Sequence, residues 1–356
     1  MTEDGGRPEL RAELMARVGA VADEVLWPMA QAVDGASSLP AEHFEAISRV
    51  GLFSMAAPQD LGGLGLGPAE SRQVLRRLGS GCGATAFAFT QHHGVVAALA
   101  RTENRALRQD WLARLCDATL AGIAFAHVRR PGPATVRAQR ERSGWRVDGE
   151  APWATSWGRA EVFLVAATTD DDQLLWFLIP GCSSDRVTAS DPLGLVVFGA
   201  TATVRIRFDG LLVPDSDVVE LVPRAIWQVG DRRAAARPSP LCLGVGDRAL
   251  ALLGEAAPAT ADALRELWAE AGRRAEEAAL AVDHQSDDVA AVAAVRAETV
   301  FAVQRLTTAL LAAAGGQGAE LRHPAQRLAR EALFYVVQAQ NEDGRQATLK
   351  ALAGPL

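Results

Sequence analysis

The chain is organised around one stretch near its C-terminus, which reads Gly315-Gly316-Gln317-Gly318-Ala319-Glu320-Leu321-Arg322-His323-Pro324-Ala325-Gln326-Arg327-Leu328-Ala329-Arg330-Glu331-Ala332. A long helix rich in Ala, Val and Leu is expected over about 288–314. Gly315-Gly316 ends it, because glycine adopts positive φ and lets another backbone or a ligand come close. Pro324 opens a second helix, where its missing N–H costs nothing. The glycines alone indicate only a helical hairpin of an all-α protein.

The first 122 residues read as helices separated by glycine-rich breaks. Residues 51–66 are too dense in glycine for a helix and form a turn-rich connector. Because no Lys-Ser/Thr follows these glycines and no strand precedes them, a phosphate-binding loop is not indicated. A further break is expected at 79–83, before a helix over 84–100. The adjacent His92 and His93 on that helix point in different directions and lack a second ligand pair, so no metal site is expected.

The character of the chain changes at Gly122, where short apolar or alternating segments replace the helical pattern. Strands spaced ten to twenty residues apart, with turn signals between them, indicate a small β-barrel or sandwich. The expected strands cover 123–128, 144–149, 162–167, 174–179 and 201–208. From about Ala225 the chain reads as helical to its end, with breaks near Pro258, near Ser286 and at Gly315.

Several motifs together resemble the flavin-dependent acyl-CoA dehydrogenase family. The C-terminal pattern is Gly-Gly-x-Gly, five residues, Pro, two residues, Arg, two residues, Arg, an acid and Ala. Residues 51–66 are similar to the family's "GL…P…GG.G" connector, residues 149–156 to "G.K.W.T(S/N)", and residues 201–214 to "S.T..v.F..V.VP". The order helical, β, helical is also that of the family and covers essentially the whole chain.

The resemblance implies a mainly α fold with a β middle domain: an N-terminal helical domain over 1–122, a β-barrel domain over 123–220 and a C-terminal four-helix bundle over 221–356. It also implies an FAD cofactor and a homodimer or homotetramer assembled through the bundle. The cofactor contacts that it implies are Phe125, Trp153, Thr155, Gly315 and Gly316, with the two glycines reaching FAD of a neighbouring subunit. From the residues alone, Trp153 could equally be a plug between the β domain and the bundle.

The chain departs from the family pattern at four places. The "TEP..GSD" loop is replaced by the shorter segment 129–134, whose two arginines are either pyrophosphate ligands or solvated loop charges. The "R…FG……Q" stretch has no counterpart in 250–270, and the Gln before the double glycine is Ala312. The catalytic glutamate of "YEGT" falls on Ala339, so the catalytic residue is unknown.

Some family members carry this glutamate on the first helix of the bundle, where the matching position is Ala234. Asp231 and Glu342 are fallback candidates for the base. A general base contributes typically about 10²–10⁴-fold to a rate, so its loss slows a dehydrogenation without abolishing binding.

Composition narrows the class of protein further. The chain has 356 residues, of which 49% are hydrophobic, and a net charge of −7, which argues against a nucleic-acid partner and against an anionic membrane surface. No apolar run reaches the roughly 18 residues of a membrane span, and the acidic N-terminus does not resemble a signal peptide. The four cysteines form no CxxC, as expected for reduced thiols in the cytoplasm.

Three functions therefore stay open. The first is an FAD-dependent oxidoreductase that acts on the CH–CH group of an acyl thioester, on CoA or a carrier protein, with weak or atypical dehydrogenation. The second is a flavin-dependent monooxygenase on the same fold, which needs no base for an α-proton. The third is a flavin-free oligomeric binding protein. An absorbance spectrum with and without added FAD separates the third from the other two.

Overall fold

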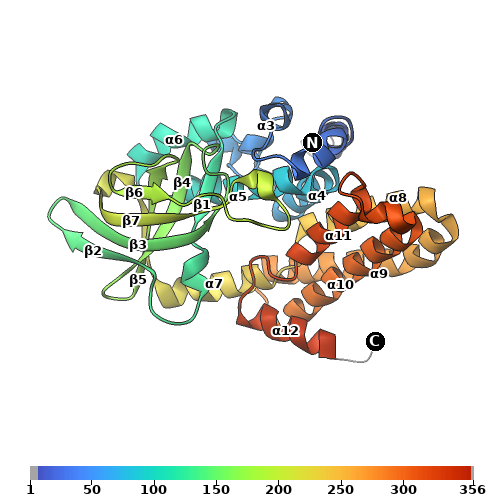
Figure 1. Cartoon of the computed structure of the whole chain (residues 1–356). Helices are drawn as coiled ribbons and strands as arrows, with labels where there is room; N and C mark the ends of the chain where they lie inside the picture. The colour runs from blue at the N-terminus through green and yellow to red at the C-terminus, as the bar shows by residue number, and fades with distance from the viewer. Residues whose placement is uncertain (1–6, 354–356) are drawn as a thin grey trace, which may run out of the picture.

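The computed structural model describes residues 7–353 and shows helices, then a β domain, then helices again. Figure 1 shows the β domain at one end, the C-terminal bundle at the other, and α5 running between them beneath the other N-terminal helices. This order confirms the expected fold class of a mainly α protein with a β middle domain. The domain boundaries at 122 and 220 stay predictions. No helix in the described range is long and apolar enough to cross a membrane.

The N-terminal region consists of helices with short 3₁₀ turns in the connector. The helical elements are α1 (Arg7–Ala20), a π-helical turn (Val21–Leu26), α2 (Trp27–Asp34), α3 (Ala41–Arg49), α4 (Pro68–Gly81), α5 (Gly83–Arg101) and α6 (Arg105–Asp117). Gly51, the first residue of the glycine-rich connector, has φ +78° and ends the turn that follows α3. Two 3₁₀ turns, Leu52–Ser54 and Gln59–Leu61, form the connector.

The β domain is one eight-stranded sheet in the order β6-β7-β3-β2-β4-β5-β8, with β1 paired to β4. The strands are β1 (Ala121–Ala124), β2 (Val136–Glu141), β3 (Gly144–Ala154), β4 (Val162–Thr169), β5 (Gln173–Pro180), β6 (Val187–Ala189), β7 (Val204–Val213) and β8 (Val218–Pro223). Side chains alternate along β4 and β5. One set, including Phe163 and Phe177, faces the main core, and the other, including Leu164 and Trp176, faces a second core that α5 and α6 cover.

The strand expected over 123–128 was partly wrong, because pairing with β4 ends at Ala124. Phe125 leaves the strand with φ −135° and ψ 8°, and residues 126–129 form a 3₁₀ turn. The strand expected over 201–208 likewise begins only at Val204, because Thr201 ends a 3₁₀ turn and Ala202 has φ +45°. Both deviations lie where strands of the β domain meet the helices.

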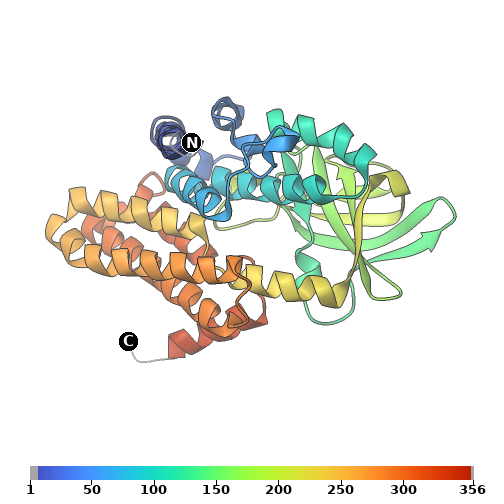
Figure 2. The same cartoon turned by 180° about the vertical axis from the view of Figure 1, so that it is seen from behind.

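The C-terminal helices are α7 (Arg224–Ala236), α8 (Pro240–Ala256), α9 (Pro258–Asp283), α10 (Val289–Ala314), α11 (Pro324–Phe334) and α12 (Glu342–Ala353). Gly315 ends α10 with φ +59°, and Pro324 opens α11. The sequence reading missed the break between α7 and α8, where Pro238 disfavours helical φ/ψ at Arg237 and Pro240 starts the next helix. Figures 1 and 2 show α7 leading from the β domain into the bundle.

The glycines of 79–83 do not form the extended break that the sequence predicted. Gly79 and Gly81 lie inside α4, and only Cys82 separates α4 from α5. A Cβ at Gly79 would approach the Leu241 backbone to 3.0 Å, and one at Gly81 would approach the Ala22 carbonyl to 2.7 Å. These glycines therefore serve the close approach of helices rather than a turn.

We expect Gly81→Ala to destabilise the protein by about 1–3 kcal/mol, because the added methyl group meets backbone that cannot move alone. The matched control is Gly94→Ala on α5, where a Cβ has no atom within 4 Å. That variant should gain about 0.5–1 kcal/mol from the reduced entropy of the unfolded chain. Urea denaturation of both variants measures the difference, and equal effects would contradict the role assigned to Gly81.

Candidate functional site

Backbone strain concentrates where β3 meets the loop before β7. Seven non-glycine residues of the described chain have positive φ, and four of them are Trp153 (+64°), Ser156 (+72°), Phe198 (+61°) and Ala202 (+45°). The Ser156 N–H donates to the carbonyl of Thr201 at 2.7 Å and ties the two segments together. Strained backbone of this kind costs about 1–3 kcal/mol per residue and clusters at ligand sites. We call residues 153–156 and 198–203 the strained junction.

A row of threonine hydroxyls lies inside the strained junction. Thr155 Oγ1 lies 3.2 Å from Thr203 Oγ1, which lies 3.0 Å from Thr201 Oγ1. The Thr201 hydroxyl donates to the carbonyl of Phe198 at 2.7 Å. All three threonines are buried, so these contacts are not shared with bulk water. The sequence motif drew attention to Thr155, whereas the roles of Thr201 and Thr203 became visible only in the structure.

Trp153 is 42% exposed, although large aromatic side chains are usually buried. The hydroxyl of the neighbouring Ser156 is buried and has no hydrogen-bond partner among the described residues. A buried hydroxyl without a partner costs free energy unless a water or a ligand satisfies it. An exposed indole beside buried hydroxyls fits a planar heteroaromatic ring with polar edges, such as the isoalloxazine of a flavin.

Phe125 belongs to a separate aromatic cluster in the second core, on the face of the sheet that α5 and α6 cover. Its ring centroid lies 5.0 Å from that of Trp176 and 6.2 Å from that of Trp227 on α7. The guanidinium of Arg129 lies 5.1 Å from the centre of the Phe125 ring, within the range of a cation–π contact. The structure therefore surrounds Phe125 with side chains of the same chain.

Arg129 also forms a bidentate ion pair with Asp231 of α7, with N–O distances of 2.6–3.0 Å. Both side chains are mostly buried, at 19% and 11% exposed. The pair occupies Arg129, so this residue is not free to bind a pyrophosphate. The same pair occupies the carboxylate of Asp231, so this side chain does not point freely towards a substrate.

The two positions considered for the catalytic base come together in the structure. Arg296 of α10 is buried and donates to the carbonyl of Ala235, next to Ala234, and to the carbonyl of Gln338, next to Ala339. Neither base position carries a carboxylate. Ala339 has φ +49°, another of the strained residues. Burial lowers the pKa of Arg296 to about 10, which leaves it charged at neutral pH.

The fallback bases are not placed to act as buried bases. Asp231 is held by Arg129, and the Glu342 carboxylate is 66% exposed and pairs with Arg345. Hydrogen bonds from Arg345 lower the pKa of Glu342. In the sequence, Arg296 stands out only as an arginine within a largely apolar helix.

Gly315 and Gly316 stand open at the end of α10. A Cβ built on either residue meets no atom within 4 Å. Both glycines are exposed, so the backbone there is accessible to a neighbouring molecule. Among the described residues of one chain, no hydrogen bond joins these glycines to the strained junction.

Two open pockets of the described chain lie elsewhere, mainly on the β domain. One, of about 480 Å³, is lined by Arg140, Trp145 and Asp215, and the other, of about 270 Å³, by Arg137 and Arg224 among others. Neither includes the cofactor contacts expected from the sequence.

The adjacent histidines are structural. The Nε2 of His92 bonds the carbonyl of Phe53 at 3.0 Å, and its Nδ1 accepts from the N–H of Ala121 at 3.2 Å. His93 packs edge-on against Phe89 and has no hydrogen-bond partner among the described residues. His127, beside Phe125, bonds the carbonyl of Ala166 at 2.9 Å. No cluster of metal ligands occurs within the described part of the chain.

Comparisons with known proteins bear on the kind of protein and on its fold. Residues 8–119 match the family model of the acyl-CoA dehydrogenase N-terminal domain. The chain is 28% identical over 205 residues to benzylmalonyl-CoA dehydrogenase of Aromatoleum aromaticum, an alignment that covers 54% of this chain and 53% of that protein. The chain spans about half the length of the curated relatives that it matches.

Solved structures match over nearly the whole chain. Butyryl-CoA dehydrogenase of Megasphaera elsdenii superposes with a TM-score of 0.78 at 16% identity, covering 97% of this chain and 98% of that one. The monooxygenase TdsC of Paenibacillus sp. A11-2, in complex with FMN and indole, superposes with a TM-score of 0.80 at 16% identity, covering 96% and 97%.

The fold is thus that of the acyl-CoA dehydrogenases, as the sequence motifs indicated. The family model over residues 8–119 and the curated relatives show that the chain is similar to acyl-CoA dehydrogenases.

The buried histidines predict a loss of stability in mild acid. Burial lowers the pKa of both His92 and His127 from 6.5 to about 4. Below pH 6.5 the unfolded chain takes up protons that the folded chain refuses, so the free energy of unfolding falls as the pH drops towards 4. Each histidine contributes up to about 1.4 kcal/mol per pH unit.

Urea denaturation at pH 7 and pH 5 measures this loss. His127→Gln keeps a donor for the Ala166 carbonyl but removes the titration, and it should reduce the difference between the two pH values. A difference that is unchanged in His127→Gln would contradict the assignment of a neutral, buried His127.

Proposed function

We propose that this chain is a flavin-dependent oxidoreductase of the acyl-CoA dehydrogenase type that acts on an acyl thioester, on CoA or a carrier protein. The observation that carries this proposal is the half-exposed Trp153 beside the buried hydroxyls of the strained junction. A flavin supplies a hydride acceptor when bound. The relatives named above support an acyl thioester as the substrate class.

FAD is the cofactor that we propose, with its ring against Trp153 and Thr155. The unpartnered hydroxyl of Ser156 supports a polar ligand edge at this place. Phe125 would line the cofactor site from behind, because Trp176, Trp227 and Arg129 already surround its ring. Gly315 and Gly316 approach the cofactor from a partner chain in a homodimer or homotetramer, which is consistent with their open surroundings.

The fit is weaker for the remainder of FAD. The loop that should hold the pyrophosphate is short, and Arg129 is occupied by Asp231. Each lost charge-assisted hydrogen bond is worth about 1.5–3 kcal/mol, so FAD affinity should be modest. The reduced thiols expected from the sequence suit a cytoplasmic enzyme, which is part of the same proposal.

Dehydrogenation of ordinary acyl-CoAs should be weak. Removing hydrogen across Cα and Cβ requires a base for the α-proton as well as a hydride acceptor. Ala339 and Ala234 cannot take a proton, and Asp231 is paired with Arg129. The chain therefore has the residues proposed to contact the flavin ring but lacks a residue that can remove the α-proton.

The missing base also favours a second candidate, a flavin-dependent monooxygenase. Such a reaction transfers oxygen from O₂ with reduced flavin and needs no α-proton base. The similarity to the monooxygenase TdsC supports the compatibility of this chemistry with the fold. Oxygen consumption with reduced flavin, without dehydrogenation, distinguishes this candidate.

The absorbance spectrum of the purified protein with added FAD should show bound flavin, and Trp153→Ala should weaken FAD binding by about 1–3 kcal/mol through loss of aromatic contact. The matched control is Trp145→Ala, in the pocket lined by Arg140 and Asp215 on the same domain. It should leave the dissociation constant of FAD unchanged. A colourless protein that ignores FAD would refute the proposal, and unchanged affinity in Trp153→Ala would refute the site.

Ala339→Glu should raise dehydrogenation of an acyl-CoA by about 10²-fold or more if this position faces the substrate, because it restores a general base. Ala339→Gln has nearly the same shape without the carboxylate and should give no gain. The rate is measured with an artificial electron acceptor in both variants. Vigorous dehydrogenation by the unmodified protein would show that another residue already acts as the base.

A further inference from the structure

The first turn of α5 contains backbone N–H groups that no acceptor of the described chain satisfies. The Ala86 N–H donates to the carbonyl of Cys82 at 3.0 Å. The N–H groups between them belong to Gly83, Ala84 and Thr85, and a helix has no acceptor of its own for its first turn. No side chain of the described residues caps this turn, and all three residues are buried. Bulk water therefore does not satisfy these donors either.

A carboxylate oxygen of α11 lies against this turn without bonding to it. Arg327 donates to Oε1 of Glu331 at 2.8 Å, whereas Oε2 has no hydrogen-bond partner among the described residues, although the side chain is only 3% exposed. A Cβ built on Gly83 would come within 2.6 Å of this Oε2. The oxygen thus lies beside the first residue of α5, where the partial positive charge of a helix N-terminus favours a carboxylate.

A third unpartnered group lies one turn further along α11. The Tyr335 side chain is 1% exposed, and its hydroxyl has no hydrogen-bond partner in the part of the chain that the structure describes. Because Tyr335 follows Glu331 by four positions, the two side chains share one face of the helix. Burial raises the pKa of Tyr335, and so do Cys242 and the Glu331 carboxylate, in agreement with this neighbouring position.

We infer that one water molecule is bound between the first turn of α5, Glu331 and Tyr335, and that it caps α5. Water accepts from a backbone N–H and donates to a carboxylate oxygen, and the tyrosine hydroxyl can do either. These groups supply the two to four polar partners that a buried water needs. The charge of Glu331 disfavours an anion, while the N–H donors and the nearby Arg327 guanidinium disfavour a cation. The site is built from this chain alone and does not require a flavin.

Aromatic rings border the site on the side of the strained junction. Cε1 of Phe198 would lie 2.9 Å from the same Cβ built on Gly83, so its ring edge borders the space that Oε2 faces. This ring stacks on Phe87 with the centroids 5.5 Å apart and meets Phe334 edge-on at 4.8 Å. The bound water therefore exchanges slowly with the solvent, and it lies where α5, α11 and the strained junction meet.

A crystal structure of the full chain, at a resolution that shows ordered solvent, tests the site directly. One solvent peak should lie within hydrogen-bond distance of Glu331 Oε2, of the Tyr335 hydroxyl and of an N–H of residues 83–85. A direct bond from one of these N–H groups to Oε2, or no solvent peak at this position, would overturn the inference.

Tyr335→Phe tests the same site through the sign of its effect on stability. If water bonds the hydroxyl, the variant loses that bond, and its unfolding equilibrium constant in urea denaturation should rise about fivefold. If the hydroxyl has no partner, its removal relieves a buried polar group. An unchanged or lower unfolding constant in this variant would therefore overturn the inference.

Thr102→Val is the control for the loss of one hydrogen bond. It removes a buried hydroxyl whose acceptor is known, the carbonyl of Val219 at 2.5 Å. Its unfolding constant should rise as well, and it sets the scale against which the effect of Tyr335→Phe is compared.

Discussion

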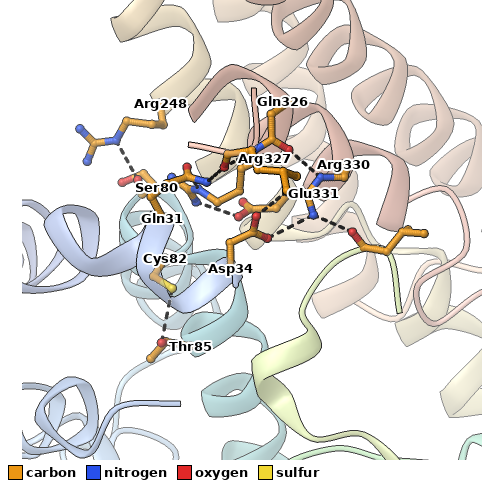
Figure 3. Close-up of polar contacts among 12 residues, drawn as sticks. Gln31, Asp34, Ser80, Cys82, Thr85, Arg248, Gln326, Arg327, Arg330 and Glu331 are labelled. Atoms are coloured by element: carbon orange, nitrogen blue, oxygen red, sulfur yellow. Dashed lines mark hydrogen bonds and ion pairs between the residues drawn. The ribbon is translucent and has the colours of Figure 1, made fainter. Parts of the chain in front are cut away.

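The structure depends on a buried ion pair within the stretch that organises the sequence. Arg327 and Glu331 face each other one turn apart on α11 at 2.8 Å, and each side chain is only 3% exposed. The guanidinium of Arg327 also lies 5.0 Å from the centre of the Trp27 ring and bonds Gln31 of α2 at 3.2 Å. Removing one partner of such a pair leaves a buried charge and typically costs about 3–5 kcal/mol. The pair thus joins the last part of the chain to the first (Figure 3).

Two consequences extend from this pair to the candidate site. Glu331 fills the space beside Gly83, where a Cβ would come within 2.6 Å of its carboxylate, which fixes the start of α5. One residue earlier, Arg330 pairs with Asp34 and donates to the carbonyl of Val196 at 2.6 Å (Figure 3). Val196 lies just before the strained junction. The positive φ angles of that junction therefore persist where helices from both ends of the chain hold the loop.

The sequence predicted the fold because its strongest signals are local. Gly315 and Pro324 mark a helix end and a helix start through backbone geometry, and the structure has both at these positions. The glycines at 79–83 misled because a glycine needed for close helix packing looks the same in sequence as one needed for a turn. That distinction depends on Leu241, more than 150 residues away, and no local pattern contains it.

In the candidate site, too, the sequence indicates residues within a short motif but not contacts between distant segments. Trp153 and Thr155 could be chosen from a short motif, but their assignment as cofactor contacts stays a prediction. The pairing of Arg129 with Asp231 and the bridge made by Arg296 join segments about 100 and 40 to 60 residues apart, so spacing along the chain does not reveal them. Both sets of contacts depend on side-chain positions that only the folded structure shows.

The most informative contrast lies between the two sides of this site. On the ring side, strained backbone and three aligned hydroxyls are kept at a cost of several kcal/mol, which a fold without use for them would lose by relaxing. On the base side, two positions that come together through Arg296 both carry alanine. The strained side can hold a planar ligand, whereas the base side offers no proton acceptor at either position. This combination is what the proposed flavin site with altered chemistry requires.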